Sequence, residues 1–416
     1  MNRRKFLKNV LGTGAAVSTC TLGNMFGISA AQASHFVGAT APTLVVIFQR
    51  GGCDGLNTVV PYGDAEYYNL RSSISIAAPS ASNANAALAI NDAPRGHNNF
   101  FGLNPNMSSL LPIYNAGHLA VLPTVHYPNN SHSHFSGQDF IESGIPNSIN
   151  DGWLYRHLAS QSSLAKSLRG DVVVPSLTHL RDFGFPSAAG DIMTRLRQNV
   201  LPLYNTAATA NPARLVNNTG KIMFNNIDTL SKIDTINYQP ANGAAYPVTA
   251  YGNRLKETAQ LIKNDVGVRV VTVDLGGFDT HSNQGGAEST GRHSRRLKEF
   301  SDGIAALYTD LGVRMNSVII LTMTEFGRTA KVNASNGTDH GDAASWFMVG
   351  KNIKGGIHGR WPGLGQTQLR RGRYLQYTVD YRNVLGDILV KHLGHTTANI
   401  AGLIPSHTYS PVGLFI

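Results

Sequence analysis

Side chains that could bind a metal ion or activate a hydroxyl group follow four apolar runs of the sequence. TLVVIF precedes GGCDGLN, LAVLPTV precedes HYPNNSHSHF, VRVVTVDL precedes GGFDTHSN, and SVIILTMT precedes EFGR and GTDHG. Carboxylate and imidazole groups bind Zn²⁺, Mn²⁺ and Mg²⁺, and Ca²⁺ where carboxylates dominate. The residue types therefore predict a divalent metal ion, with its identity and number left open. The candidate ligands are Asp54, Asp279, His281, Glu325, Asp339 and His340.

The same motifs hold residues that could act on a substrate. A serine beside a metal can lose its proton and attack a phosphorus or sulfur centre, and Ser133 is the candidate nucleophile. It could equally cap the helix that follows. Arg328 could neutralise charge on the transferred group, or it could simply pair with Glu325. His134 and Arg50 are candidate substrate-binding residues, although Arg50 could instead form a structural ion pair.

The elements that must position these residues alternate along the chain. Continuous apolar runs at 43–48, 119–125, 268–275 and 317–324 are typical of strands buried on both faces. Helices are predicted at 107–117, 293–312 and 381–394. This order predicts an α/β fold, a mostly parallel, doubly wound sheet flanked by helices. Ligands of such sheets bind beyond the carboxyl ends of the strands, so the four motifs should share one rim.

The mature chain is expected to form one domain, 34–416. Its middle part, about 155–262, is rich in Asn, Ala, Thr and Ser and should be a helical insertion or cap, with one helix at 213–233. The polar stretch 76–98 should be a surface loop.

The first residues indicate export. MNRRKFLKN is followed by a short apolar stretch and by Ala31-Gln32-Ala33, which predicts a twin-arginine (Tat) signal peptide over 1–33. The protein should therefore meet the Tat export machinery and reach the periplasm or the medium. No later apolar run is long enough for stable membrane insertion. Cys53 is the one cysteine outside the leader, so no disulfide can form within the mature chain.

Composition excludes some functions and leaves others open. The net charge is +10, but the basic residues are not clustered, so we expect no nucleic-acid partner. The mild positive charge suits an anionic ester substrate, small or polymeric. A nucleotide-dependent oxidoreductase is disfavoured because the first turn is GGCDG rather than GxGxxG, and its Asp54 would repel a pyrophosphate. Cys53 should be a small residue packed beneath that turn. The oligomeric state is open.

A family resemblance sharpens these expectations. LVVIFQRGGCDGLNTVVPYGDAEYYNLR, SHSHFSGQDF, VDLGGFDTH, LTMTEFGRT, GTDHG and HGRWPGL resemble an exported bacterial family, domain of unknown function 1501. That family in turn resembles the alkaline phosphatase superfamily, which includes sulfatases. The second resemblance implies an alkaline-phosphatase-like fold, with Asp54 as the first-strand metal ligand and Ser133 as the nucleophile. It also implies Asp279 with His281 on one metal and His340 as the final histidine.

One departure from the superfamily pattern separates two functions. Where the superfamily has Asp-His-Gly, this chain has Glu325-Phe326-Gly327, and a phenylalanine cannot bind a metal. The first hypothesis is an exported, metal-dependent hydrolase of phosphate or sulfate esters. SHSHFSG lacks the Pro-Ser-Arg context of the main sulfatases, which favours phosphate chemistry. The alternative is a non-catalytic envelope protein whose degenerate hydrolase scaffold binds a glycan, an anionic polymer or a partner protein.

Overall fold

The computed structural model describes residues 42–128, 131–145, 152–161, 233, 237–266 and 268–416. The predicted leader and most of the predicted cap, including its helix at 213–233, lie outside these residues. Within them, no helix is long and apolar enough to cross a membrane.

The centre of the described part is a seven-stranded sheet in the order β10-β5-β8-β7-β1-β6, with β9 beside β5. All pairings are parallel except those of β8, which runs antiparallel to both β5 and β7. The sheet is therefore mixed and mostly parallel, and the predicted α/β class is confirmed. Its strands are β1 (Thr43–Gln49), β5 (Leu119–His126), β6 (Val270–Leu275), β7 (Val318–Met323), β8 (Ala344–Val349), β9 (Gly356–Ile357) and β10 (Val379–Asp380).

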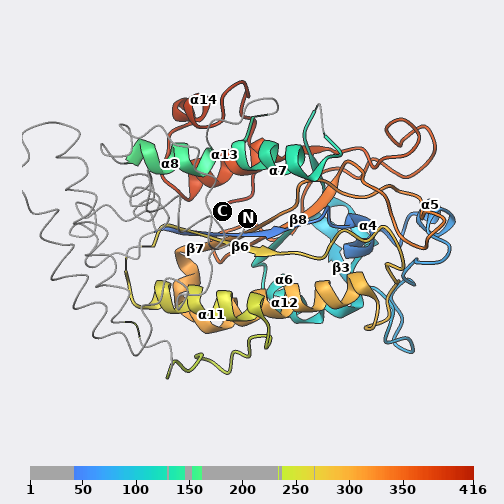
Figure 1. Ribbon diagram of the computed structural model, residues 1–416, viewed down its shortest axis with the longest axis horizontal. Coiled ribbons are helices and arrows are strands. Elements are labelled where there is room, and N and C mark those ends of the chain that lie inside the picture. The colour runs from blue at the N-terminus through green and yellow to red at the C-terminus, as the bar shows by residue number, and fades with distance from the viewer. Residues whose placement is uncertain (1–41, 129–130, 146–151, 162–232, 234–236, 267) are drawn as a thin grey trace, which may run out of the picture.

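Helices cover both faces of this sheet (Figure 1). Side chains of β1 alternate between the two layers, with Val45 and Ile47 in one core and Leu44 and Val46 in the other. One face carries α6 (Leu111–Asn115), α11 (Ala250–Lys263) and α12 (Arg292–Leu311). The other carries α7 (His134–Ser143), α8 (Trp153–Gln161), α13 (Tyr381–Lys391) and α14 (Ile400–Leu403).

A second, three-stranded sheet in the order β2-β4-β3 corrects the predicted loop at 76–98. This stretch contains β3 and the start of β4, and Ile90 and Asp92 are buried between exposed neighbours. The strand went unpredicted because it is only five residues long and lies in a stretch rich in Ser, Asn and Ala. Its strands are β2 (Val59–Val60), β3 (Leu88–Asp92) and β4 (His97–Leu103); the short helices are α4 (Gly55–Thr58), α5 (Ala65–Leu70), η1 (Ala93–Arg95), η2 (Pro105–Leu110), η5 (Gly312–Asn316) and η6 (Thr397–Asn399).

The four predicted strands are present as β1, β5, β6 and β7, and two of the three predicted helices are present as α12 and α13. The predicted helix at 107–117 is instead divided into η2 and α6. Pro112 stands at the start of α6, where a missing backbone N–H is tolerated, and the chain before it adopts the tighter helix.

Acid should destabilise this fold through His126, a buried residue at the end of β5. Burial lowers the pKa of His126 to about 3, below its unfolded value of about 6.5. The stability that comes from the neutral ring is thus complete above about pH 6.5 and is lost as the pH falls from there toward the folded value. We expect this residue to contribute a slope of about 1.4 kcal/mol per pH unit to the free energy of unfolding between these limits.

Urea unfolding at several pH values between 6.5 and 4.5, with a chelator present, measures that slope. In the variant His126→Gln, one fewer proton is taken up on unfolding. The slope of its unfolding free energy against pH should therefore be smaller by about 1.4 kcal/mol per pH unit. His97→Gln, at a partly exposed position on β4, is the matched control and should keep the native slope. Equal slopes for the native chain and His126→Gln would contradict the assignment.

Candidate metal centre

Three histidines and one aspartate meet where the parallel strands end. Asp279 and His281 follow β6, and His340 lies in the loop that leads into β8. His134 is the first residue of α7, the helix that follows β5. In the sheet, β8 separates β5 from β7, β1 and β6. Because β1, β5, β6 and β7 all point the same way, their carboxyl ends deliver these loops to one edge of the sheet.

Each of the three histidine rings is anchored through its Nδ1 atom. Nδ1 lies 2.8 Å from Glu325 Oε1 in His134, 3.1 Å from Asp339 Oδ1 in His281, and 2.6 Å from the His132 carbonyl oxygen in His340. Carbonyl and ionised carboxylate oxygens only accept hydrogen bonds, so Nδ1 must carry the proton in each ring. In the neutral ring the lone pair is then on Nε2, the atom that faces the other rings.

The Nε2 atoms converge on Asp279. His281 Nε2 and His340 Nε2 lie 2.9 Å apart, and Asp279 Oδ1 is 3.1 Å from the first and 3.3 Å from the second. His134 Nε2 lies 3.5 Å from Asp279 Oδ2 and is buried without a hydrogen-bond partner. Two Nε2 lone pairs at 2.9 Å repel each other unless a proton or a cation lies between them. Ligand atoms of His134, Asp279 and His340 all lie within 4.8 Å of one another, a group that could hold a metal ion.

The surroundings of the two carboxylates and of His340 favour the ionisation states that metal binding requires, whereas the hydrogen bond to Glu325 raises the pKa of His134 and favours its protonated form. Burial would raise the pKa of Asp279, but the hydrogen bond and positive charge of Arg328 bring it below its ordinary value. Burial would likewise raise the pKa of Glu325, and the hydrogen bonds from His134 and Gln138 lower it instead. Burial lowers the pKa of His340. The carboxylates are therefore ionised and His340 favours its neutral form, as metal binding requires.

Arg328 is buried beneath the centre and joins the loops that follow β1, β6 and β7. Its guanidinium group is buried and lies 2.6 Å from Asp279 Oδ1. It also donates to backbone carbonyl groups on three loops, so its donors point into the protein rather than toward a bound molecule. The structure thus gives Arg328 a positioning role in place of the expected contact with substrate. The carbonyl acceptors belong to Gly51, Gly52, Phe278 and Thr338.

Gly51 and Gly52 allow this close packing. Gly51 has a φ of 119°, and a Cβ atom there would lie 2.5 Å from the backbone nitrogen of Asp279. A Cβ atom at Gly52 would lie 2.5 Å from the ring of Phe326. The backbone N–H of Gly51 donates to Glu325 Oε1 at 2.9 Å. The glycine pair therefore brings the end of β1 against the carboxylate that anchors His134.

Asp54 lies outside the metal-binding group. It is fully buried and forms an ion pair with Arg71, and Gln284 Nε2 donates to its Oδ2 at 2.5 Å. The neighbouring Cys53 is a buried free thiol, and burial raises its pKa to about 12, as expected of a packed, unreactive residue. Asp54 was expected as a metal ligand, but it pairs with buried residues beneath the ends of the strands. His134 is in the metal-binding group in its place.

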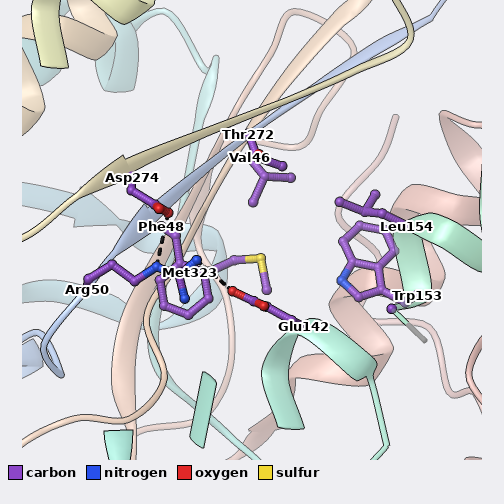
Figure 2. Close-up of a pocket in the computed structure, with 10 residues that line it drawn as sticks. Val46, Phe48, Arg50, Glu142, Trp153, Leu154, Thr272, Asp274 and Met323 are labelled. Atoms are coloured by element: carbon purple, nitrogen blue, oxygen red, sulfur yellow. Dashed lines mark hydrogen bonds and ion pairs between the residues drawn. The ribbon is translucent and has the colours of Figure 1, made fainter. Parts of the chain in front are cut away.

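Arg50 occupies a separate pocket on the α7 side of the sheet (Figure 2). Its guanidinium group pairs with Glu142 Oε1 at 2.6 Å and with Asp274 Oδ1 at 3.0 Å, and it lies 3.8 Å from the centre of the Phe48 ring. Arg50 therefore forms the structural ion pairs that the sequence left open. The pocket is lined by Val46, Phe48, Arg50, Glu142, Gly152, Trp153, Leu154, Thr272, Asp274 and Met323.

Ser133 stands immediately before the ligand-bearing residue His134. It occupies the N-cap position of α7, but its hydroxyl group makes no capping hydrogen bond, and the residue is exposed. Phe326 packs on the rings of His134 and His340 with centroid distances of 5.0 and 4.7 Å. Phe326 therefore forms an apolar floor beside two of the histidine rings.

Of the residues expected at one rim, the structure therefore brings most together. His134, Asp279 and His340 form the group that could hold a metal ion, and His281 lies beside them. The sequence had suggested His134 for substrate rather than metal. Glu325 and Asp339, expected as ligands, instead hold the rings of His134 and His281. The pairing of His132 and His134 in SHSHF just before a helix was the available signal for His134.

The comparisons with known proteins give one family. Residues 235–399 match the family described as "Protein of unknown function (DUF1501)". This range includes Asp279, His281 and His340 but not His134 or Ser133. No curated protein and no solved structure matches the chain.

Proposed function

We propose that the protein is a metal-dependent hydrolase of anionic phosphate or sulfate esters, with the metal ion held by His134, Asp279, His281 and His340. The observation that carries this proposal is the shared state of the three histidines. Each donates its Nδ1 proton to an oxygen atom and directs Nε2 toward Asp279. Such oxygen partners behind the rings are typical of histidine ligands to metals.

The donor set narrows the choice of metal. Three imidazole nitrogens and one carboxylate suit Zn²⁺ or Mn²⁺ better than Mg²⁺ or Ca²⁺, which prefer oxygen ligands. Catalytic zinc sites have three protein ligands and an open position, so catalysis with four protein ligands here would require the zinc coordination to expand to five. We therefore propose zinc as the first metal to test.

In this proposal, individual residues have distinct roles in the reaction. A bound divalent ion would polarise an ester oxygen and favour loss of a proton from a neighbouring hydroxyl group. Ser133 offers an exposed hydroxyl group beside His134 for attack on the phosphorus or sulfur atom. Arg328 fixes the orientation of Asp279, while Glu325 and Asp339 fix the rings of His134 and His281. The leader MNRRKFLKN supports a periplasmic or secreted enzyme in this proposal.

Ser133→Ala tests the nucleophile. Removal of the attacking hydroxyl should lower kcat for 4-nitrophenyl phosphate or 4-nitrophenyl sulfate by at least about 10³-fold, because a serine nucleophile and its activating group act as a unit. The measurement is turnover by zinc-loaded protein, with bound zinc quantified in the same samples. The zinc content should not change, since Ser133 is not among the proposed ligands.

Ser131→Ala is the matched control. The Ser131 hydroxyl accepts a hydrogen bond from the backbone nitrogen of Ser133 at 3.1 Å, so it shares the loop without being the proposed nucleophile. This variant should keep most of the native turnover. Native kcat in Ser133→Ala would exclude Ser133 and leave a water molecule as the attacking group.

One observation favours the non-catalytic alternative. Asp54 is tied to Arg71, and Phe326 fills the position of a superfamily ligand, so the described residues offer one metal site where the alkaline phosphatase pattern has two. A protein that retains the metal site but hydrolyses none of the phosphate and sulfate esters would support a binding role for this scaffold.

A further inference from the structure

The candidate metal centre has a buried side and a solvent-exposed side. Its inner wall is formed by Glu325 and Arg328, whose side chains have no exposed surface. Its outer side is formed by Asp279, His281 and Asp339, whose side chains are 46%, 45% and 41% exposed. Asp339 and His281 therefore lie on the side of the centre that faces solvent.

Arg373 stands on this solvent-exposed side. Its side chain is 54% exposed, and its Nη2 lies 3.2 Å from Asp339 Oδ2, while the other oxygen of Asp339 binds His281. Arg373 is thus linked to a proposed metal ligand through a single carboxylate. Neither arginine that the sequence suggested for substrate is in this position, because Arg328 is buried and Arg50 lies in the pocket beside α7.

The backbone around Arg373 is constrained. Arg370 and Tyr374 pair across a tight turn, whose Arg371 and Gly372 have φ values of 55° and 61°. The ring of Tyr374 lies between two guanidinium groups, 5.6 Å from that of Arg373 and 5.7 Å from that of Arg370. A second bridge joins Tyr374 to Thr329, next to Arg328. The turn therefore holds Arg373 on the solvent-exposed side before any ligand arrives.

The charge of the site depends on the metal. Without an ion, the carboxylates outnumber the guanidinium groups among the described residues that form or support the site. A divalent cation reverses the sign and makes the site attractive to anions. The carboxylates are those of Asp279, Glu325, Asp339 and Asp342, and the guanidinium groups are those of Arg328, Arg370 and Arg373.

We propose that Arg373 binds the anionic oxygen atoms of the substrate's phosphate or sulfate group on the solvent-exposed side of the metal site. The inference rests on the proposed function and deepens it by naming the residue that selects an anionic group. The planar guanidinium group can offer two parallel N–H donors to such a group, which a lysine cannot do.

Calorimetric titration of the zinc-loaded full chain, freed of excess metal, with orthophosphate and separately with sulfate tests this proposal. Arg373→Gln should weaken binding of the preferred anion by about 10- to 100-fold, the range expected for hydrogen bonds to charged groups. Arg373→Lys should lie between the two, since it keeps the charge but loses the paired donors. Metal-free protein should bind neither anion. The stronger of the two titrations identifies phosphate or sulfate as the recognised group.

Arg314→Gln is the matched control, because Arg314 also forms an ion pair with an exposed aspartate, Asp265, but lies just before β7 at the opposite end of the strands. It should bind the anion as the native chain does. Native affinity in Arg373→Gln, with native zinc content, would overturn the proposal. Metal-dependent anion binding that requires Arg373, in a protein that hydrolyses no ester, would instead sustain the inference while removing the hydrolase.

Discussion

Replacing His281 with alanine should lower the zinc affinity of the protein by at least about 100-fold if, as we propose, it is one of four protein ligands. His281 is 45% exposed, so the substitution removes a ligand without opening a cavity in the core. Any metal-dependent ester hydrolysis should fall with the bound metal. Competition with a chromophoric chelator measures the affinity, and mass spectrometry of the native protein measures the stoichiometry.

Asp339→Asn tests the residue that holds the His281 ring, rather than the proposed ligand itself. Asp339 accepts the Nδ1 proton of His281 at 3.1 Å, and an amide at this position can still accept that hydrogen bond without carrying the charge. Mutation of such a partner typically weakens metal binding by about 10- to 100-fold, and the variant, which removes only the charge, should lose less zinc affinity than His281→Ala. His97→Ala, on β4, removes a histidine outside the centre and should leave zinc affinity unchanged.

If His281→Ala binds zinc with native affinity, His281 is not a zinc ligand. Failure of the native chain to bind zinc, manganese or any other divalent metal would remove the metal centre itself. The close approach of the His281 and His340 Nε2 atoms would then require a proton shared between the two rings.

The fold was accessible from the sequence where burial leaves a simple pattern. β1, β5 and β7 are buried along their whole length, which is why they read as nearly continuous apolar runs, and β6 departs from this pattern only at the partly exposed Thr272 and Asp274. β8, ASWFMV, is just as buried, but it was not predicted, and neither was its antiparallel direction. The direction of β8 is set by its pairing with β5 and β7, and the residue types within β8 do not indicate which strands it pairs with.

The site was accessible only in part, for a related reason. The order of strands followed by polar residues predicted that the loops after β5, β6 and β7 would meet. It could not tell which of several carboxylates faces solvent and which faces inward. Asp54 and Asp279 both follow a pair of glycines, yet Asp54 turns toward the buried Arg71 and Asp279 toward the histidines. That difference depends on Arg71, which comes from a different segment and gave no signal of its own.

The Asp54–Arg71 pair leads to the largest expected effect on stability. Both side chains are buried, and Arg71 also donates to the carbonyl groups of Thr329 and Ala330, which lie beyond Arg328. Asp54→Ala should lower the free energy of unfolding by about 3 to 5 kcal/mol, because it leaves the guanidinium group buried without its counter-ion. Urea unfolding of the native chain and the variant, at pH 7.5 with a chelator present, measures the difference.

Two comparisons show whether the uncompensated charge is the cause. The double variant Asp54→Leu with Arg71→Met removes both charges and should recover most of the lost stability, since apolar residues of similar volume often replace a buried pair without loss. Asp265→Asn breaks the exposed pair with Arg314 and should change the free energy of unfolding by about 0 to 1 kcal/mol. If the double variant is no more stable than Asp54→Ala, then packing around Asp54 accounts for the loss, and the ion pair does not.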